Sequence, residues 1–349
     1  MSVSEQPSVS IIVPTARADD NLRWCLSSIV AAHPASDELL VLVDGGDPEA
    51  CALAAQFGAR VMPTALRSGP AAARNAAAQL VTGAILFFVD SDVVIPPDAV
   101  ARVRQAFVDY PDAAAIFGSY DDAPAAPNFF SQYKNLLHHY VHQQGCEEAS
   151  TFWAGCGAIR ADAFRAVNGF DAGYRIPSME DIELGYRLRA SGRRIRLVKS
   201  LQVKHLKHWT AGSLIRADFL ARALPWSRLI LSSGVLINDL NVTIRSRVCA
   251  VLVYGLLLAL GLAIRWPVLL WLAAVQVAAL LVLNADLYRF FLRKRGFWFT
   301  LAVIPWHWFY YFYGALAFAI AWTQHNLRRL SRLGARPTGR PTSAGGLQP

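Results

Sequence analysis

Residues Ala84–Asp98, A-I-L-F-F-V-D-S-D-V-V-I-P-P-D, decide the fold. The apolar run that ends at Val89 is too short for a membrane span and predicts a strand buried on both faces of a parallel sheet. Asp90 and Asp92 follow at once, where the strand leaves the sheet. Ligands of open α/β sheets collect at that edge, and carboxylates spaced in this way hold a hard divalent cation while substrate phosphates supply further oxygens. A strand-end turn is the alternative interpretation.

Strands and helices alternate on both sides of this stretch. The expected strands are Val9–Val13, Leu39–Val43, Arg60–Met62, Ala115–Ser119, Ala154–Ile159, Ile195–Val198 and Leu201–Val203. The expected helices are Asp20–Ala32, Pro48–Phe57, Ser68–Leu80, Pro97–Val108, Asn128–Gln144, Asp162–Asn168 and one that begins at Glu180. This alternation indicates βαβ units and a mostly parallel sheet.

Arg74 lies early in an alanine-rich helix that follows the glycine turn at Gly69. Small residues allow close backbone approach, and a helix N-terminus favours negative charge. The segment therefore suits an anion, although a solvated arginine on a packed helix explains it equally well.

Glu180 and Asp181 open another helix, where capping and compensation of the helix dipole explain two acids. Three histidines, His138, His139 and His142, raise the question of a zinc site. No cysteine or acid is spaced to complete a tetrahedral set, so we expect an exposed or substrate-facing helix there.

The apolar residues are concentrated in the C-terminal part of the chain. Of the 349 residues 54% are hydrophobic, yet 34 are Lys or Arg. The net charge of +9 does not indicate nucleic-acid binding, because many basic residues flank apolar spans and no zinc-spaced cysteines or RNA-binding signature accompany them. The five scattered cysteines predict a reducing compartment without a disulfide framework.

The sequence predicts four regions: a soluble domain over residues 1–210, interfacial or linker helices over 211–247, membrane helices over 248–323 and a basic, disordered tail over 324–349. The expected spans are about 248–264, 267–283 and 297–322, each long enough for a hydrocarbon core of roughly 30 Å. Whether the third segment spans or is re-entrant stays open, since counting places the tail outside while its arginines favour the inside. No signal peptide is evident, so we expect the first domain in the cytoplasm and the chain in the cytoplasmic membrane.

The combined motifs resemble the family 2 glycosyltransferases. The motifs run in order from residue 9 to residue 209: I-I-V-P-T, V-D-G-G-D, G-P-A-A-A-R-N, F-V-D-S-D, G-F-D and M-E-D-I-E-L-G-Y-R-L. The resemblance implies an α/β fold of the GT-A type, which is Rossmann-like, with a mixed, mostly parallel sheet flanked by helices. Here a C-terminal transmembrane helical region follows that domain.

The resemblance also implies roles for individual residues. Pro14 and Thr15 would lie near the nucleotide base, with Asp44 on the base or ribose and Arg74 near the donor diphosphate. Asp90 and Asp92 would form the pair at a divalent cation, Mg²⁺ or Mn²⁺, with Asp92 as the direct ligand and His205 helping. Asp181 would be the general base, with Glu180 beside it, and Lys207 would help to neutralise the diphosphate.

Two departures from the family pattern stand out. Many members read D-D-G-S where this chain has Asp44-Gly45-Gly46-Asp47, which puts the base contacts in question. The Q-x-x-R-W motif of processive synthases is not found, so we expect transfer of one or a few sugars.

The sequence thus predicts a metal-dependent, inverting glycosyltransferase that moves a sugar from a nucleotide sugar, such as a UDP- or GDP-sugar, to a lipid or lipid-linked acceptor. One base opposite the leaving group gives inversion, and no second carboxylate nucleophile is needed. The alternatives are a soluble or polysaccharide acceptor with the membrane part only an anchor, and a catalytically silent membrane scaffold that binds nucleotide sugars.

Overall fold

The computed structural model describes residues 6–235 and 238–334. Within them the strands form one eight-stranded sheet in the order β3-β2-β1-β4-β7-β6-β8-β5. They are β1 (Val9–Thr15), β2 (Glu38–Val43), β3 (Arg60–Pro63), β4 (Ile85–Val89), β5 (Val93–Val94), β6 (Ala113–Tyr120), β7 (Cys156–Arg160) and β8 (Arg194–His205). Strands β3, β2, β1 and β4 pair in parallel, β7 is antiparallel to β4 and β6, and β8 is parallel to β6. The expectation of a mixed, mostly parallel α/β sheet is confirmed.

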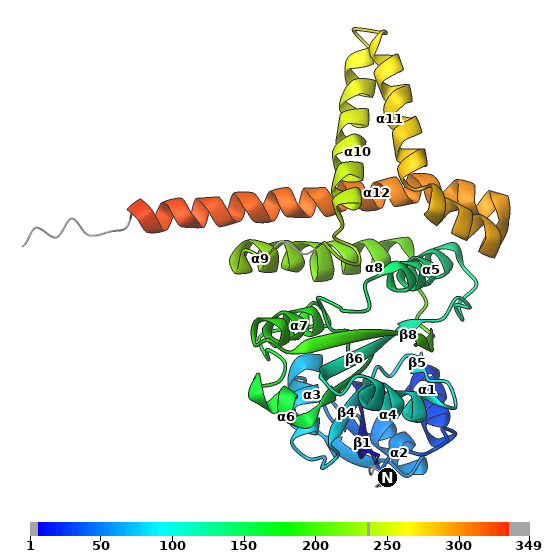
Figure 1. The fold of residues 1–349 in the computed structure, drawn as a ribbon, viewed down its shortest axis with the longest axis vertical. Coiled ribbons are helices and arrows are strands. Elements are labelled where there is room, and N and C mark those ends of the chain that lie inside the picture. The colour runs from blue at the N-terminus through cyan, green and yellow to red at the C-terminus, as the bar shows by residue number, and fades with distance from the viewer. Residues whose placement is uncertain (1–5, 236–237, 335–349) are drawn as a thin grey trace, which may run out of the picture.

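Helices cover both faces of this sheet (Figure 1). The helices of the first domain are α1 (Asp20–Val30), α2 (Pro48–Gln56), α3 (Pro70–Ala78), α4 (Ala99–Asp109), α5 (Phe129–Gln144), α6 (Ala161–Ala166) and α7 (Glu180–Ala190). Each expected helix is present, with ends that differ by a few residues. Local chemistry starts them: Asp19 accepts a hydrogen bond from Leu22 N at 2.9 Å at the start of α1, and Asp47 caps α2 in the same way ahead of Pro48.

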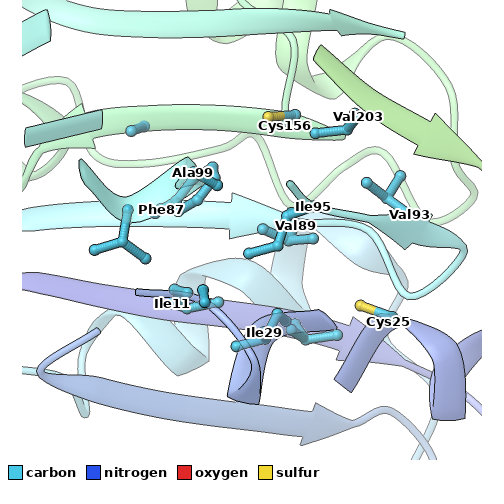
Figure 2. Packing of buried hydrophobic residues seen from close by; sticks show 14 of the residues in the cluster. Ile11, Cys25, Ile29, Phe87, Val89, Val93, Ile95, Ala99, Cys156 and Val203 are labelled. Carbon is cyan, nitrogen blue, oxygen red and sulfur yellow. The ribbon is translucent and has the colours of Figure 1, made fainter. Parts of the chain in front are cut away.

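Strand β4 is buried on both faces, as its apolar run predicts. Phe87 belongs to the core on the α1 and α4 side, which Figure 2 shows with Ile11, Ile29 and Val89. Phe88 points to the other side, against Phe164 and Phe170. Burying each such ring contributes about 1.5–3 kcal/mol relative to exposure, so this strand fixes the centre of the sheet.

The carboxyl ends of β1, β2 and β4 meet at one edge of the sheet because these strands are parallel. The antiparallel strand β7 begins at this edge, since Val89 pairs with Cys156. The end of β8 reaches it too, because His205 pairs with Val93 of β5. Five strands that are far apart in the sequence, β1, β2, β4, β7 and β8, therefore end or begin at this edge.

The remaining helices lie beyond this edge. They are α8 (Ala211–Arg216), the π-helix η1 (Ala217–Ala223), α9 (Leu224–Ser233), α10 (Ile244–Ala263), α11 (Leu269–Leu283) and α12 (Ala285–Gly334). Helices α10 and α11 form a hairpin that stands away from the sheet, whereas α9 and α12 run across the top of the first domain (Figure 1). Helix α10 is by itself long and apolar enough to cross a membrane, and α11 and α12 meet that condition only as one pair bent by 64°.

Helix α12 contacts α5 of the first domain and the helices η1 and α9, which distinguishes it from an isolated span. His307 Nδ1 lies 3.0 Å from Tyr133 Oη of α5, Tyr313 donates to Asp218 of η1 at 3.0 Å, and Gln324 accepts from Arg228 of α9 at 2.9 Å. The expected third span, 297–322, lies within this helix. The start of the expected tail, 324–334, is helical as well, and residues 335–349 lie outside the described residues.

Candidate active site

Asp90 and Asp92 lie where β4 ends, as expected, and they have different partners. The Asp90 carboxylate is 2.6 Å from Arg74 Nη2. The Asp92 carboxylate is 3.5 Å from His205 Nε2, and its backbone oxygen accepts from Leu206 N at 2.8 Å. Burial alone would raise the pKa of Asp92, but the charge and hydrogen bond of His205 and the charge of Lys207 outweigh it, so the net pKa is lowered. Asp92 is thus an ionised carboxylate with 26% of its side chain exposed.

His205 is held in a fixed orientation beside Asp92. Its Nδ1 lies 2.7 Å from Asn135 Oδ1 of α5, and its ring stacks on Tyr120 with centroids 4.3 Å apart. Because Asn135 Oδ1 can only accept, Nδ1 carries the hydrogen of this bond, and Nε2 faces the Asp92 carboxylate. Outer hydrogen-bond partners orient metal-binding histidines in the same way.

A carboxylate and an imidazole nitrogen fit Mg²⁺ or Mn²⁺ as part of a ligand set. Among residues 6–235 and 238–334 no three His, Cys, Asp or Glu side chains are grouped closely enough to hold a metal by themselves. An ion at Asp92 and His205 would therefore take further oxygens from a bound phosphate or from water.

Arg74 is buried between two carboxylates, one from each acidic motif. Its Nη1 lies 3.0 Å from Glu180 Oε1, and its Nη2 bonds to Asp90. The ring of Phe170 lies 5.5 Å from its guanidinium carbon. The sequence-based alternative of a solvated arginine is wrong, since the side chain is almost fully buried. Arg74 instead joins the end of β4 to the start of α7.

Glu180 and Asp181 lie in the first turn of α7 and differ in burial. Glu180 is buried and uses both oxygens, one on Arg74 and one on Ser178 N at 2.8 Å. Asp181 is half-buried and accepts from Ala154 N at 3.2 Å. Burial and the charge of Glu180 raise the pKa of Asp181 to about 7, although Arg74 and two backbone N–H groups oppose the shift. A half-buried carboxylate with this pKa is suited to accept a proton near neutral pH.

The expected nucleotide-base residues lie at the ends of β1 and β2. Pro14 and Thr15 close β1, and the Thr15 hydroxyl donates to Arg17 O at 3.0 Å. The Asp44 carboxylate accepts from Ser68 N at 2.8 Å and Gly69 N at 2.9 Å, so it holds the loop before α3.

The lysine and the histidines near the site have their own partners. Lys207 is exposed, with its ammonium 4.5 Å from the centre of the Trp209 ring. His139 and His142 bond to backbone oxygens of β6. Both are buried, so the expectation of an exposed helix is wrong: α5 packs between the sheet and α12.

Three contributors were missed by the sequence analysis: Tyr120, Asn135 and Asp218. Tyr120 and Asn135 lie in apolar or mixed segments without a motif, and no sequence signal distinguishes them. Asp218 and Arg222 are four residues apart on one helix face and bond at 2.8 Å, so their spacing was a usable signal.

Two models of known protein families match parts of the first domain. The model of glycosyl transferase family 2 matches residues 10–167, and the model described as the N-terminal domain of galactosyltransferase matches residues 137–209. Residues 10–167 therefore match the family 2 glycosyltransferases, which supports the resemblance that the motifs indicate. The family match and the sheet agree with the expected GT-A type of fold.

Two relatives are similar in sequence. The O-antigen biosynthesis protein RfbC of Myxococcus xanthus is 26% identical over 241 residues, 63% of this chain and 18% of that protein. Validoxylamine A glucosyltransferase of Streptomyces hygroscopicus subsp. limoneus is 26% identical over 233 residues, 55% of this chain and 50% of that protein. The match thus spans half or less of each relative's length. Among solved structures, GalNAc-T7 with UDP, GalNAc and Mn²⁺ aligns with a TM-score of 0.49 at 15% identity, over 65% of this chain and 48% of that one.

Proposed function

We propose that the chain is an inverting glycosyltransferase that moves a sugar from a nucleotide-sugar donor to a lipid or lipid-linked acceptor at the cytoplasmic membrane. The observation that carries the proposal is the position and pKa of Asp181, a half-buried carboxylate whose pKa is about 7 and whose helix is joined to Asp90, at the end of β4, through Glu180 and Arg74. The family match supports the donor class.

Asp181 acts as the general base in this mechanism. It accepts the proton of the acceptor hydroxyl while that oxygen attacks the anomeric carbon, and the bond to the nucleoside diphosphate breaks on the opposite face. Attack from the opposite face inverts the anomeric configuration. Glu180 and Arg74 hold the start of α7 at the end of β4, so they position the base.

Asp92 and His205 are the residues that would hold Mg²⁺ or Mn²⁺. When bound, the cation would neutralise charge on the departing diphosphate. Lys207 is exposed beside this pair and supplies a further positive charge, and its field contributes to the low pKa of Asp92 after that of His205. Pro14, Thr15 and Asp44 remain our candidates for the nucleotide side of the donor.

The membrane attachment is also a proposal. Helix α10 has 20 residues, which at 1.5 Å each span about 30 Å. Apolar side chains are exposed along the α10–α11 hairpin, among them Val251, Leu258 and Trp271, and a surface of this kind indicates a lipid or protein environment. In this topology α10 and α11 enter and return, while α12 lies on the same side as the first domain. The basic residues Arg328 and Arg329 would then lie on the cytoplasmic side.

The acceptor would be presented between the end of β8 and the hairpin. This region runs from Leu206 to residue 237, of which 236–237 lie outside the described residues. It carries aromatic and basic side chains together, Trp226, Arg216 and Arg228 among them, a mixture suited to the headgroup layer of a membrane.

Donor turnover by the purified chain tests the function. We expect release of nucleoside diphosphate from one of a panel of nucleotide sugars, dependent on Mg²⁺ or Mn²⁺, and a product of inverted anomeric configuration by NMR. Asp92→Ala should lose metal-dependent donor binding in calorimetry while the domain stays folded by circular dichroism. Unchanged metal-dependent affinity in Asp92→Ala would refute the metal assignment, and no turnover of any donor would refute the activity.

A further inference from the structure

A cavity of about 1000 Å³ lies among the helices beyond the sheet edge, with Lys134 of α5 also in its lining. Its walls come from η1 and α9 on one side and from α10 and α12 on the other. These helices meet at the base of the α10–α11 hairpin (Figure 1). This volume is at the upper end of the range for small-molecule pockets.

One end of the cavity carries a charged cluster of Lys134, Asp218 and Arg222. Lys134 Nζ lies 2.7 Å from Asp218 Oδ1, and Arg222 Nη1 lies 2.8 Å from the same oxygen. Tyr313 of α12 donates to the other oxygen at 3.0 Å. Two cations share one carboxylate, so this end carries an excess positive charge. Arg222 still has 44% of its side chain exposed, which leaves part of its guanidinium available to an anion.

The charged end is bonded to the helix that carries Asp181. Ser178, in the turn before α7, donates to the backbone oxygen of Ala221 in η1 at 2.5 Å. Trp226, which lines the cavity, donates to Tyr186 of α7 at 3.3 Å. Burial lowers the pKa of Arg222, but Asp218 and, more weakly, Tyr120 and Asp181 raise it, so the net pKa is raised. The cluster and the proposed base therefore lie within electrostatic reach of one another.

The wall of the cavity that α10 and α12 form carries apolar side chains, among them Val251, Leu258 and Phe318. Helix α10 is long and apolar enough to cross a membrane alone, so in the proposed topology this wall continues into the hydrocarbon layer.

We propose that this cavity binds the acceptor of the reaction as an amphiphile, with its apolar chain between α10 and α12 and a phosphate-bearing head at Arg222 and Lys134. This inference rests on the proposed function. The hydrogen bonds from η1 and α9 to α7 connect the cavity lining to the helix that carries Asp181. Such a connection favours a substrate as the occupant over a bulk phospholipid, because a structural lipid does not need to lie near the general base.

Gly314 allows the cavity to be filled without a clash. It lines the cavity, and a Cβ added there meets no described atom within 4 Å. The leucine side chain in Gly314→Leu should therefore occupy the space proposed for the apolar chain of the acceptor. Gly261→Leu is the matched control, because Gly261 is helical, has similar open space and lies outside the cavity lining.

The binding experiment uses the full chain in phosphatidylcholine nanodiscs without donor. The probe is dodecyl phosphate with a photoreactive diazirine in its chain, and the cross-linked residues are located by mass spectrometry. We expect cross-links to α10 and α12, reduced about tenfold in Gly314→Leu and unchanged in Gly261→Leu. Wild-type labelling of Gly314→Leu would overturn the inference.

The charged end is tested with Arg222→Gln, which leaves Lys134 on Asp218. The control Arg102→Gln removes an arginine that pairs with an aspartate at the same i,i+4 spacing on an unrelated helix, α4. We expect weaker labelling only in Arg222→Gln, and competition by dodecyl phosphate but not by dodecanol or inorganic phosphate. Equal competition by phosphatidylglycerol would overturn the inference in favour of a bulk-lipid site. No donor is present in this experiment, so it measures binding alone. If binding fails, the transferase activity can still be measured separately on a water-soluble acceptor analogue.

Discussion

At the scale of single residues, the carboxyl of Asp181 links reactivity to pH and to stability. Burial and the neighbouring charge of Glu180 raise its pKa to about 7, from a usual value near 4. The folded state therefore holds this proton up to a higher pH than the unfolded chain does. Its contribution to stability is fully present at pH below the unfolded pKa and is lost as the pH rises through about 7.

The first prediction is that kcat/KM rises with pH and levels above about pH 7, falling about tenfold per unit below it, because the base must be deprotonated. Asp181→Asn should lose about 10²–10⁴-fold in transfer rate and, at pH 8, melt at a higher temperature than wild type, since it removes a buried charge. Rate profiles and thermal melts measure both effects. Asp109→Asn, on the exposed end of α4, is the control. A flat pH profile with full activity in Asp181→Asn would show that this residue only starts a helix.

The second prediction concerns Arg74, which is shared by Glu180 and Asp90. Arg74→Met leaves Glu180 buried without its cation and should cost about 3–5 kcal/mol of unfolding free energy. Arg74→Lys, with a single point charge, should restore only part of this loss. Urea unfolding measures the difference, with Arg102→Met as the exposed control pair. A loss in Arg74→Met no greater than in Arg102→Met would contradict the bridging role.

At the scale of elements, the approach of α7 to the segment before β7 is very close. A Cβ at Gly185 would lie 2.5 Å from Phe152 N and 2.8 Å from backbone atoms of Thr151. This segment leads to Ala154, whose N–H bonds to Asp181. The glycine therefore permits the contact that orients the proposed base.

The third prediction is that Gly185→Ala moves α7 outward, destabilises the fold by about 1–3 kcal/mol and lowers kcat more than it changes donor affinity. A Cβ added at Gly212, in the first turn of α8, meets no described atom within 4 Å, and alanine has the higher helix propensity, so Gly212→Ala should be neutral or slightly stabilising. Chemical unfolding and donor titrations of both variants provide the comparison. Wild-type kcat in Gly185→Ala would show that the close contact is not needed.

Elements with strong local patterns could be predicted from the sequence, whereas pairings between distant segments could not. The apolar run before Asp90 and the periodic helices determine their own conformation. Strand β5, Val93–Val94, is too short to give a pattern. The residues expected as two late strands form one strand, β8, whose pairing with β6 shifts register between Phe117 and Ser119.

The candidate site could likewise be predicted only in part from the sequence. Asp92 and Asp181 were predicted because they stand in motifs that resemble those of the family 2 glycosyltransferases. The contact of Arg74 with both acidic motifs depends on long-range packing and has no local signal. The cluster around Asp218 depends on α5, η1 and α12, three elements that only the tertiary fold brings together.

At the scale of the whole molecule, α12 joins the first domain to the hairpin. Its bonds to α5, η1 and α9 place it across the domain, as Figure 1 shows. In the proposed topology, with α10 and α11 as a membrane hairpin, the first domain and the described end of α12 would lie on the same side of the membrane.

The fourth prediction tests this topology with an impermeant maleimide in sealed vesicles. His325→Cys in α12 should react from the same side as the native, exposed Cys146 of the first domain. Trp266→Cys, between α10 and α11, should react only from the opposite side. Intact and inverted vesicles measure labelling from the two sides of the membrane, and the wild-type chain measures the labelling of Cys146 alone. Reaction of His325→Cys from the side opposite to Cys146 would show that α12 crosses the membrane.

The attachment of α12 to the first domain has a consequence for the size of the product. If the hairpin sets the depth of the molecule in the bilayer, the docked α12 holds Asp181 at a constant height above the lipid surface. An acceptor is then selected by how far its reactive hydroxyl extends from its membrane anchor. Each added sugar moves the new terminal hydroxyl beyond that height, so the geometry itself would end the reaction after one or a few additions.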